Sequence, residues 1–198
     1  MPVTISGDGT VTGLSVGGLP DGSVDADTLA SNAVTSAKLH SGAVTGTHMP
    51  AGSVIKFQNT RGPASNQNIS SNTTWTTLTG TQVDFTPTFS NCKLDLNWVF
   101  TLELQGGTNG IAFRIYRQSP IGGSDTLIFE MDQHSHWSTG IASWSGPGQI
   151  YLHHVDTPGV TTPVRYYVQG YKEQGNNLYI NYGADDDGIN MTIREIRQ

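Results

Sequence analysis

Hydrophobic side chains recur at every fifth position over the first part of the chain. The positions are Leu14, Leu19, Val24, Leu29, Val34, Leu39, Val44, Met49 and Val54. Five steps rotate a side chain by about 140° on an α-helix and move it to the opposite face of a strand, so neither regular element keeps these positions together. The pattern therefore predicts an irregular segment that turns once in each repeat unit.

The same stretch is a repeat of ten residues. Its units are GSVDADTLAS at 22–31, NAVTSAKLHS at 32–41, GAVTGTHMPA at 42–51 and the stub GSV at 52–54. Three polar residues are placed to cap a single helical turn, namely Asp25, Thr35 and Thr45. Four others suit a left-handed residue that ends such a turn, namely Gly22, Asn32, Gly42 and Gly52. We expect each decapeptide to join a short extended piece to one tight turn.

A thread with one apolar side chain in five cannot fold alone. Ordering its backbone costs about 1–2 kcal/mol per residue, which so few apolar contacts do not offset. Wrapping identical chains around one axis would bury the apolar positions, and three chains suit a narrow, filled centre. We therefore expect a homotrimeric stalk whose core is the nine residues above; a flexible linker is the alternative.

From about Ile55 onward the pattern changes to the alternation of β-strands. In residues 93–104 the side chains of Leu94, Leu96, Trp98, Phe100, Leu102 and Leu104 take one face. Similar alternation recurs in Ile111/Phe113/Ile115, Leu127/Phe129/Met131 and Val164/Tyr166/Val168, and Gly-, Asn- and Pro-containing turns separate the runs. The predicted strands are 73–78, 83–86, 92–104, 111–117, 126–131, 137–144, 149–155, 164–171, 178–182 and 189–196.

Ten short strands without a convincing amphipathic helix predict a mostly β protein. We expect an antiparallel β-sandwich of jelly-roll type, with a barrel as the alternative architecture. The expected division is an N-terminal attachment segment at 1–21, the stalk at 22–54 and a C-terminal knob at 55–198.

The composition argues against nucleic-acid binding and membrane insertion. The 198 residues carry 10 Lys+Arg against 16 Asp+Glu, a net charge of −6, with no basic run suited to nucleic acid. The single cysteine, Cys92, is expected to be a buried apolar residue. The first residues lack the pattern of a signal peptide and no apolar run is long enough to span a bilayer, so we expect synthesis in a cytoplasm and no membrane insertion.

The repeat resembles a known family. The decapeptides NAVTSAKL and GAVTGTHM are similar to the GAVTTAKL-like units of tail-fibre and receptor-binding virion proteins from phages of marine and cyanobacterial hosts. The knob shares looser features with the same group, including DTPGVTTPVRYYVQGY and the closing TIREI. The resemblance implies a homotrimer in the virion, joined through its N-terminus to other phage proteins, whose knob binds a host glycan or outer-membrane protein.

That implied role leaves one alternative open. Only three full decapeptides are present, whereas many fibres have long shafts. The alternative is a purely structural virion component, such as a baseplate part, an adaptor or a head appendage.

Few residues suggest specific chemistry. His134 and His136 could present imidazoles to an axial metal ion in a trimer, and the acidic turn at 185–187 is a candidate for calcium, although surface loops explain both. Trp137, Trp144 and Tyr151 are candidates for stacking on a receptor sugar. No nucleophile elbow, phosphate loop or zinc signature occurs, so we expect a binding protein and not an enzyme, with no obligatory cofactor.

Overall fold

The computed structural model divides into two compact units, Met1–Thr45 and Gly46–Gln198. It describes residues 4–5, 7, 11–12, 22–24, 27, 29–62, 67–70, 74–104, 111–131, 148–172, 178–180 and 188–198. The boundary between the units falls inside the third decapeptide, so the last turn of the repeat belongs with the knob.

The first unit is built from local turns. A short antiparallel pair, β1 (Thr4–Ile5) and β2 (Val11–Thr12), lies near its start. Later, the amide of Ala33 bonds to the carbonyl of Ala30 and the amide of Lys38 to that of Thr35, each closing a tight turn. Every side chain of this unit whose burial is described is exposed. The described part of this unit therefore has an ordered backbone and no buried side chain.

Left-handed residues recur with the decapeptide, as expected. Gly22, Asn32, Gly42 and Gly52 have φ of 77°, 64°, 82° and 86°. Asn32 and Gly42 are the third residues of turns closed by Ala33 and Ala43, which is where a type II β-turn needs positive φ. These residues do not end a helical turn, so the predicted role was wrong although the conformation was right.

The number of turns also differs from the prediction. The 3₁₀ turns η1 (Ser36–Lys38) and η2 (Gly46–His48) are separate from the β-turns that contain the left-handed residues. In the decapeptides 32–41 and 42–51, which the structure describes throughout, the chain therefore turns once in about every five residues, which accounts for the spacing of the apolar positions. Thr35 precedes η1 as predicted, but its side chain makes no capping hydrogen bond. Asp25 lies outside the described residues.

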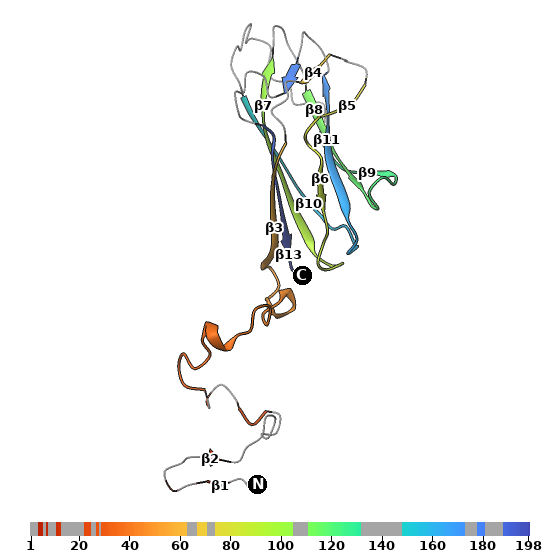
Figure 1. The fold of residues 1–198 in the computed structure, drawn as a ribbon. Helices are drawn as coiled ribbons and strands as arrows, with labels where there is room; N and C mark the ends of the chain where they lie inside the picture. Colours follow the sequence, from red (N-terminus) through yellow and green to blue (C-terminus); the bar gives the residue numbers. More distant parts are fainter. Residues whose placement is uncertain are drawn as a thin grey trace. The chain divides into compact units, whose positions relative to one another are not determined.

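The second unit contains two antiparallel sheets (Figure 1). The first has the strand order β3-β13-β7-β10, and two short strands, β12 and β4, continue it beside the far end of β7. Its strands are β3 (Val54–Arg61), β4 (Gln67–Ile69), β7 (Lys93–Leu104), β10 (Gly148–Asp156), β12 (Leu178–Ile180) and β13 (Asn190–Ile196).

The second sheet has the strand order β6-β11-β8-β9, with β5 continuing β6 along the edge of β11. Its strands are β5 (Thr76–Thr77), β6 (Val83–Phe85), β8 (Ile111–Gln118), β9 (Asp125–Glu130) and β11 (Val164–Lys172). The eight main strands are β3, β6, β7, β8, β9, β10, β11 and β13. When they are numbered 1 to 8 along the chain, the strand order is 1-8-3-6 in the first sheet and 2-7-4-5 in the second. This is the strand order of a jelly roll, as predicted.

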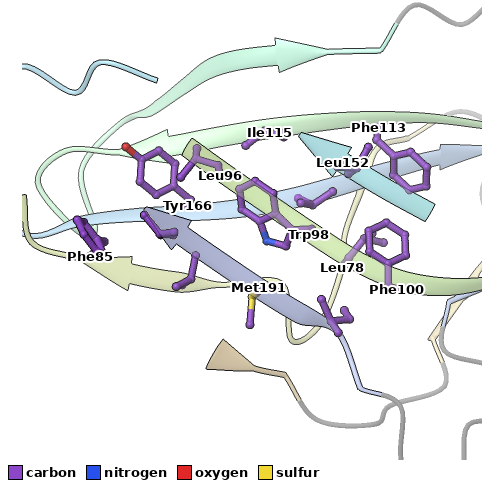
Figure 2. Packing of buried hydrophobic residues seen from close by; sticks show 14 of the residues in the cluster. Leu78, Phe85, Leu96, Trp98, Phe100, Phe113, Ile115, Leu152, Tyr166 and Met191 are labelled. Carbon is purple, nitrogen blue, oxygen red and sulfur yellow. The ribbon is translucent and has the colours of Figure 1, made fainter. Parts of the chain in front are cut away.

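One hydrophobic core lies between the two sheets (Figure 2). β7 contributes Leu94, Leu96, Trp98 and Phe100, each at most 2% exposed, so its predicted alternation is confirmed. Phe100 meets Phe113 of the opposite sheet edge to face, with ring centroids 5.4 Å apart. The Trp98 indole N–H donates to the carbonyl of Thr81 at 3.0 Å, which satisfies the only polar atom of this side chain.

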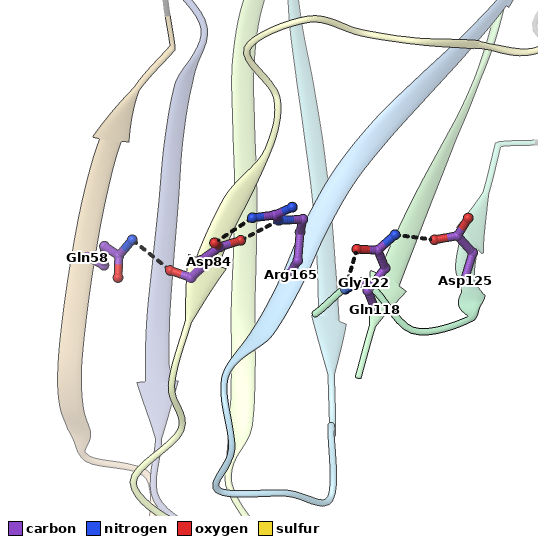
Figure 3. Close-up of polar contacts among 6 residues, drawn as sticks. All are labelled: Gln58, Asp84, Gln118, Gly122, Asp125 and Arg165. Atoms are coloured by element: carbon purple, nitrogen blue, oxygen red, sulfur yellow. Dashed lines mark hydrogen bonds and ion pairs between the residues drawn. The ribbon is translucent and has the colours of Figure 1, made fainter. Parts of the chain in front are cut away.

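Polar side chains tie the sheets together along the edges (Figure 3). Gln58 of β3 donates to the carbonyl of Asp84 on β6 at 3.1 Å, joining one sheet to the other. The Asp84 carboxylate accepts two bonds from Arg165, at 2.6 and 2.8 Å, and this pairing lowers its pKa. Arg117 and Tyr166 both donate to Asp156, where burial raises the pKa of the tyrosine strongly.

One predicted alternation fails, in β9. Ile115 pairs with Phe129 but its neighbour Tyr116 pairs with Leu127, so Ile128 is an extra residue in a β-bulge. A bulge shifts the two-residue alternation by one, and Leu127 is therefore 43% exposed while Phe129 packs on the core. The predicted strands that fall on described residues match the structure to within a few residues, whereas 137–144 lies outside them. β3 and β4 were not predicted.

Candidate functional surfaces

The apolar positions of the repeat are uniformly exposed. Val24, Leu29, Val34, Leu39, Val44, Met49 and Val54 have exposed fractions of 48, 46, 55, 46, 57, 36 and 48%. Each side chain from Leu29 to Met49 is followed by a tight turn, closed at Ala33, Lys38, Ala43, Met49 and Ser53 in succession. Leu14 and Leu19 lie outside the described residues. A single chain thus presents a regular set of unburied aliphatic side chains.

The last turn of the repeat is fastened to the knob. Arg197, one residue after β13, donates from Nη1 to the carbonyls of Thr47 and Met49. The amide of Gly52 donates to the carbonyl of Arg197 at 2.8 Å, and the amide of Arg197 to that of Ser53 at 3.0 Å. These bonds fix the start of β3 against the end of β13.

A buried carboxylate supports the same junction. Glu195 is 0% exposed and accepts bonds from the amides of Thr88 and Phe89, at 2.7 and 3.0 Å, and from the Thr88 hydroxyl at 2.9 Å. Phe89 in turn meets Gly46, where a Cβ would lie 3.0 Å from its ring. The carboxylate therefore positions the ring on which the turn rests.

Cys92 belongs to this buried neighbourhood. It is 0% exposed, and burial, followed by the Glu195 carboxylate, raises the pKa of its thiol to about 12. The prediction of a buried apolar cysteine is confirmed.

On the outer face of the β3-β13-β7-β10 sheet, paired residues of neighbouring strands form rows of side chains across the sheet. In the row toward the start of β3, Phe57, Arg194, Asp95 and Val155 lie side by side; the next row is Asn59, Thr192, Asn97 and His153; the third is Arg61, Asn190, Val99 and Tyr151. These three rows combine polar side chains with three exposed apolar or aromatic ones, at Phe57, Val155 and Tyr151.

Asp95 is the centre of the polar contacts on this face. Its carboxylate receives Arg194 Nη1 at 3.0 Å, lies 2.7 Å from His153 Nε2 and accepts the Asn97 amide at 3.2 Å. Its side chain is 16% exposed. These bonds hold side chains from three strands, β7, β10 and β13, in a fixed arrangement, so the face is a defined surface.

A shallow depression of about 310 Å³ lies at the far end of this face. It is lined by Arg61, Val99, Phe100, Thr101, Gln149, Gly188 and Asn190. Thr101 Oγ1 is buried there and has no hydrogen-bond partner among the described residues. Tyr151 stands beside the depression, 69% exposed, with its hydroxyl bonded to Gln149. The predicted candidate Tyr151 therefore presents a ring next to polar donors and acceptors.

Aromatic side chains on the other sheet pack against one another. Tyr116 stacks on Tyr167 with ring centroids 5.4 Å apart, and Trp75 meets Tyr171 at 5.2 Å. Arg114 covers Trp75, with its guanidinium carbon 3.9 Å from the ring centroid. This face is consequently less suited to stacking a ligand than the ring of Tyr151.

The other predicted site residues lie in parts of the chain that the structure does not describe. Trp137, Trp144, His134, His136 and the acidic turn 185–187 lie outside the described residues. Among the residues that the structure does describe, no three His, Cys, Asp or Glu side chains gather as a metal site would require. Within that same set no helix is long and apolar enough to cross a membrane.

The known proteins that resemble the chain do so distantly. No protein-family model and no curated protein matches it. Among solved structures, it is similar to the VP2 subviral particle of infectious bursal disease virus, with 8% identity, a TM-score of 0.45 and coverage of 72% of this chain and 32% of that one. The T13 viral particle of the same virus gives 13% identity, a TM-score of 0.39 and coverage of 73% and 36%.

A bacterial protein matches to a similar degree. Dimeric latent PorU from Porphyromonas gingivalis gives 8% identity, a TM-score of 0.36 and coverage of 75% of this chain and 14% of that one. The chain thus spans about a third or less of the length of these structures. The sandwich is defined by the chain's own strand pairing.

Proposed function

We propose that this chain is a homotrimeric, tail-fibre-like virion protein that attaches a phage particle to a host surface through its knob. The observation that carries the proposal is the set of aliphatic side chains at every fifth residue, each about half exposed in one chain. Exposure of an entire regular set is costly in water and is relieved when sister chains bury it. The resemblance of the decapeptides to phage fibre repeats supports the same role.

A stalk needs each repeat to keep its geometry when it meets its partners. The recurring turns supply that, since the left-handed residues at 32 and 42 occur in hydrogen-bonded turns ten residues apart. The bonds of Arg197 hold the last turn of the repeat, which belongs to the second unit, to the knob. The knob is in this account held at the end of a three-chain stalk, with the N-terminus joined to other virion proteins.

For host binding, the surface that we propose is the depression beside Tyr151. An exposed aromatic ring next to amide and hydroxyl groups suits the apolar face and the hydroxyls of a saccharide. A shallow site binds one sugar weakly, but three linked copies gain affinity by about 10²–10⁴. Trp137 and Trp144 remain proposed as further contacts, an axial metal at His134 and His136 remains a minor proposal, and no catalytic step is included.

The test uses full-length protein, cells of marine bacteria and cyanobacteria, and lipopolysaccharide purified from those cells. We expect the trimer to bind at least one cell type, Tyr151→Ser to weaken binding about tenfold or more, and Leu127→Ser, an exposed residue of the other sheet, to have no effect. A trimer that binds neither cells nor lipopolysaccharide but is retained by other virion proteins would support the purely structural alternative and contradict host attachment.

A further inference from the structure

Phe57 is the most exposed of the large purely apolar side chains in the described part of the knob. Its exposed fraction is 59%, against 43% for Leu127 and 43% for Val155. It lies on β3, an edge strand that pairs with β13 alone among the described strands. Burial of this ring against a partner surface would be favourable, because a large apolar area would leave water.

A β-bulge places Phe57 on the same face as the last apolar residue of the repeat. Val54 pairs with Ile196 and Lys56 pairs with Glu195, so Ile55 is an extra residue in β3. In a regular strand Val54 and Phe57, three residues apart, would point to opposite faces. The bulge cancels this difference, and both side chains lie on the outer face of the sheet.

The inner side chains of β3 confirm this orientation. Lys56 Nζ lies over the ring of Phe85 and donates to the carbonyl of Thr86, and Gln58 reaches across to Asp84. Phe57 lies between these two and therefore points away from the second sheet. In its own row it neighbours Arg194, whose ion pair with Asp95 separates it from Val155.

We infer that this stalk-side part of the outer face, namely Val54, Phe57, Arg194 and Val155, is a contact between sister knobs in the trimer. The inference rests on the proposed trimeric stalk. Val54 is both the last residue of the apolar set and the first residue of β3. If the apolar set packs around a threefold axis, Phe57 lies within about 10 Å of Val54, the last residue of that packed set, because three residues of strand span about that distance.

The occupant of this surface is a second copy of the chain. The face continues directly from the residues that the stalk would bury, so bringing three stalks together brings three copies of Phe57 together. The depression beside Tyr151 is two rows farther along the same face, at the other end from Phe57. The sheet face is thus divided between self-contact at the stalk side and ligand binding at the far side.

The test compares two exposed apolar residues on opposite sheets in the full-length chain, Phe57→Ser and Leu127→Ser. We expect Phe57→Ser to raise the concentration for half-assembly about tenfold or more and Leu127→Ser to leave it within about twofold. Circular dichroism checks that both variants keep the β-sandwich. A Phe57→Ser variant that assembles like wild type would overturn the inference.

Failure of the inference is distinguishable from failure of the proposed trimer. A monomeric wild-type chain contradicts the trimer itself. If the wild type is a trimer that Leu39→Asp dissociates and Phe57→Ser does not, the trimeric stalk is supported and the contact between knobs is contradicted.

Cross-linking supplies a second measurement that does not depend on stability. In a Cys92→Ala background, Phe57→Cys should be joined to a sister chain by a short bismaleimide, whereas Leu127→Cys should not. Equal cross-linking at both positions, or none at position 57, would contradict the inference.

Discussion

The stalk and the knob of this protein obtain their order in opposite ways. In the first unit every side chain whose burial is described is exposed, and the backbone is held by turns whose partners are three residues apart. Among the described residues of the knob, twenty buried ones form one core between two sheets, and partners such as Asn59 and Thr192 lie 133 positions apart in sequence. The knob therefore has a source of stability within one chain, whereas the described part of the first unit has its shape specified by local turns. In the trimer that we propose, sister chains would supply the stability of the stalk.

The last turn of the repeat belongs to the second unit and is held there by the knob. Arg197 bonds to the carbonyls of this turn, and the buried carboxylate of Glu195 binds the amides of Thr88 and Phe89 beside it. The last turn thus gains a fixed position from polar groups at the C-terminal end of the chain.

The largest effect is expected in the knob core. Phe113→Ala removes a 0% exposed ring that meets Phe100 edge to face, and it should lower the free energy of unfolding by about 3–5 kcal/mol. Urea denaturation followed by circular dichroism measures this. Leu127→Ala, which removes a 43% exposed side chain, should cost less than about 1 kcal/mol. Equal losses would show that the described core is not the main source of stability.

The junction comes next. Glu195→Gln replaces a carboxylate oxygen by an amide N–H, which opposes a donor from Thr88 or Phe89, and should cost about 1–3 kcal/mol. Denaturation checks the cost. Amide hydrogen exchange at Met49 and Gly52 should also become faster if the last turn loosens. Exchange that is unchanged while stability falls would show that Glu195 does not support the turn.

A smaller effect is expected in the stalk. Gly42 has a φ of 82°, so Gly42→Ala should cost about 1 kcal/mol per chain and weaken assembly while the urea midpoint of the knob stays unchanged. Sedimentation at several concentrations measures assembly. Asn32→Gly, at a φ of 64°, should be neutral or strengthening. A knob that melts earlier in Gly42→Ala would contradict the independence of the two regions.

The smallest effect is a dependence on pH. His154 packs beside Phe129, and burial lowers the pKa of its imidazole from the usual 6.5. Between the folded pKa and about 6.5 the unfolded chain binds a proton that the folded chain does not, so stability should fall as the pH drops below about 6.5. Urea denaturation at pH 7.5 and 5.5 measures the loss. His154→Gln should reduce this loss; an identical loss in the variant would assign it to other groups.

Local pattern was enough to predict much of this architecture. The alternation in β7 and β11 follows from a sheet with one buried face, and the apolar spacing of five residues correctly indicated a segment of turns. The role of Gly42 was misread because positive φ suits both the end of a helical turn and the third position of a type II β-turn. Sequence composition does not distinguish these two uses.

What could not be predicted depends on bulges and on long-range contacts. The bulges at Ile55 and Ile128 shift the alternation of β3 and β9 by one residue. For this reason β3 was not predicted, and Leu127 was predicted on the buried face although it lies on the exposed one. Arg197 and Met49 are 148 positions apart, and no local signal relates them. Tyr151 was predicted as a candidate for stacking on a sugar, but the depression beside it could not be predicted, because residues from four strands and Gly188 form it.

The proposed trimer requires sister chains to bury the exposed aliphatic set of the repeat. The mass of the full-length protein in solution at micromolar concentration tests this, by sedimentation equilibrium or native mass spectrometry. A trimer gives three times the subunit mass of 21.2 kDa. A well-ordered particle with the mass of one subunit would show that the chain folds without sister copies.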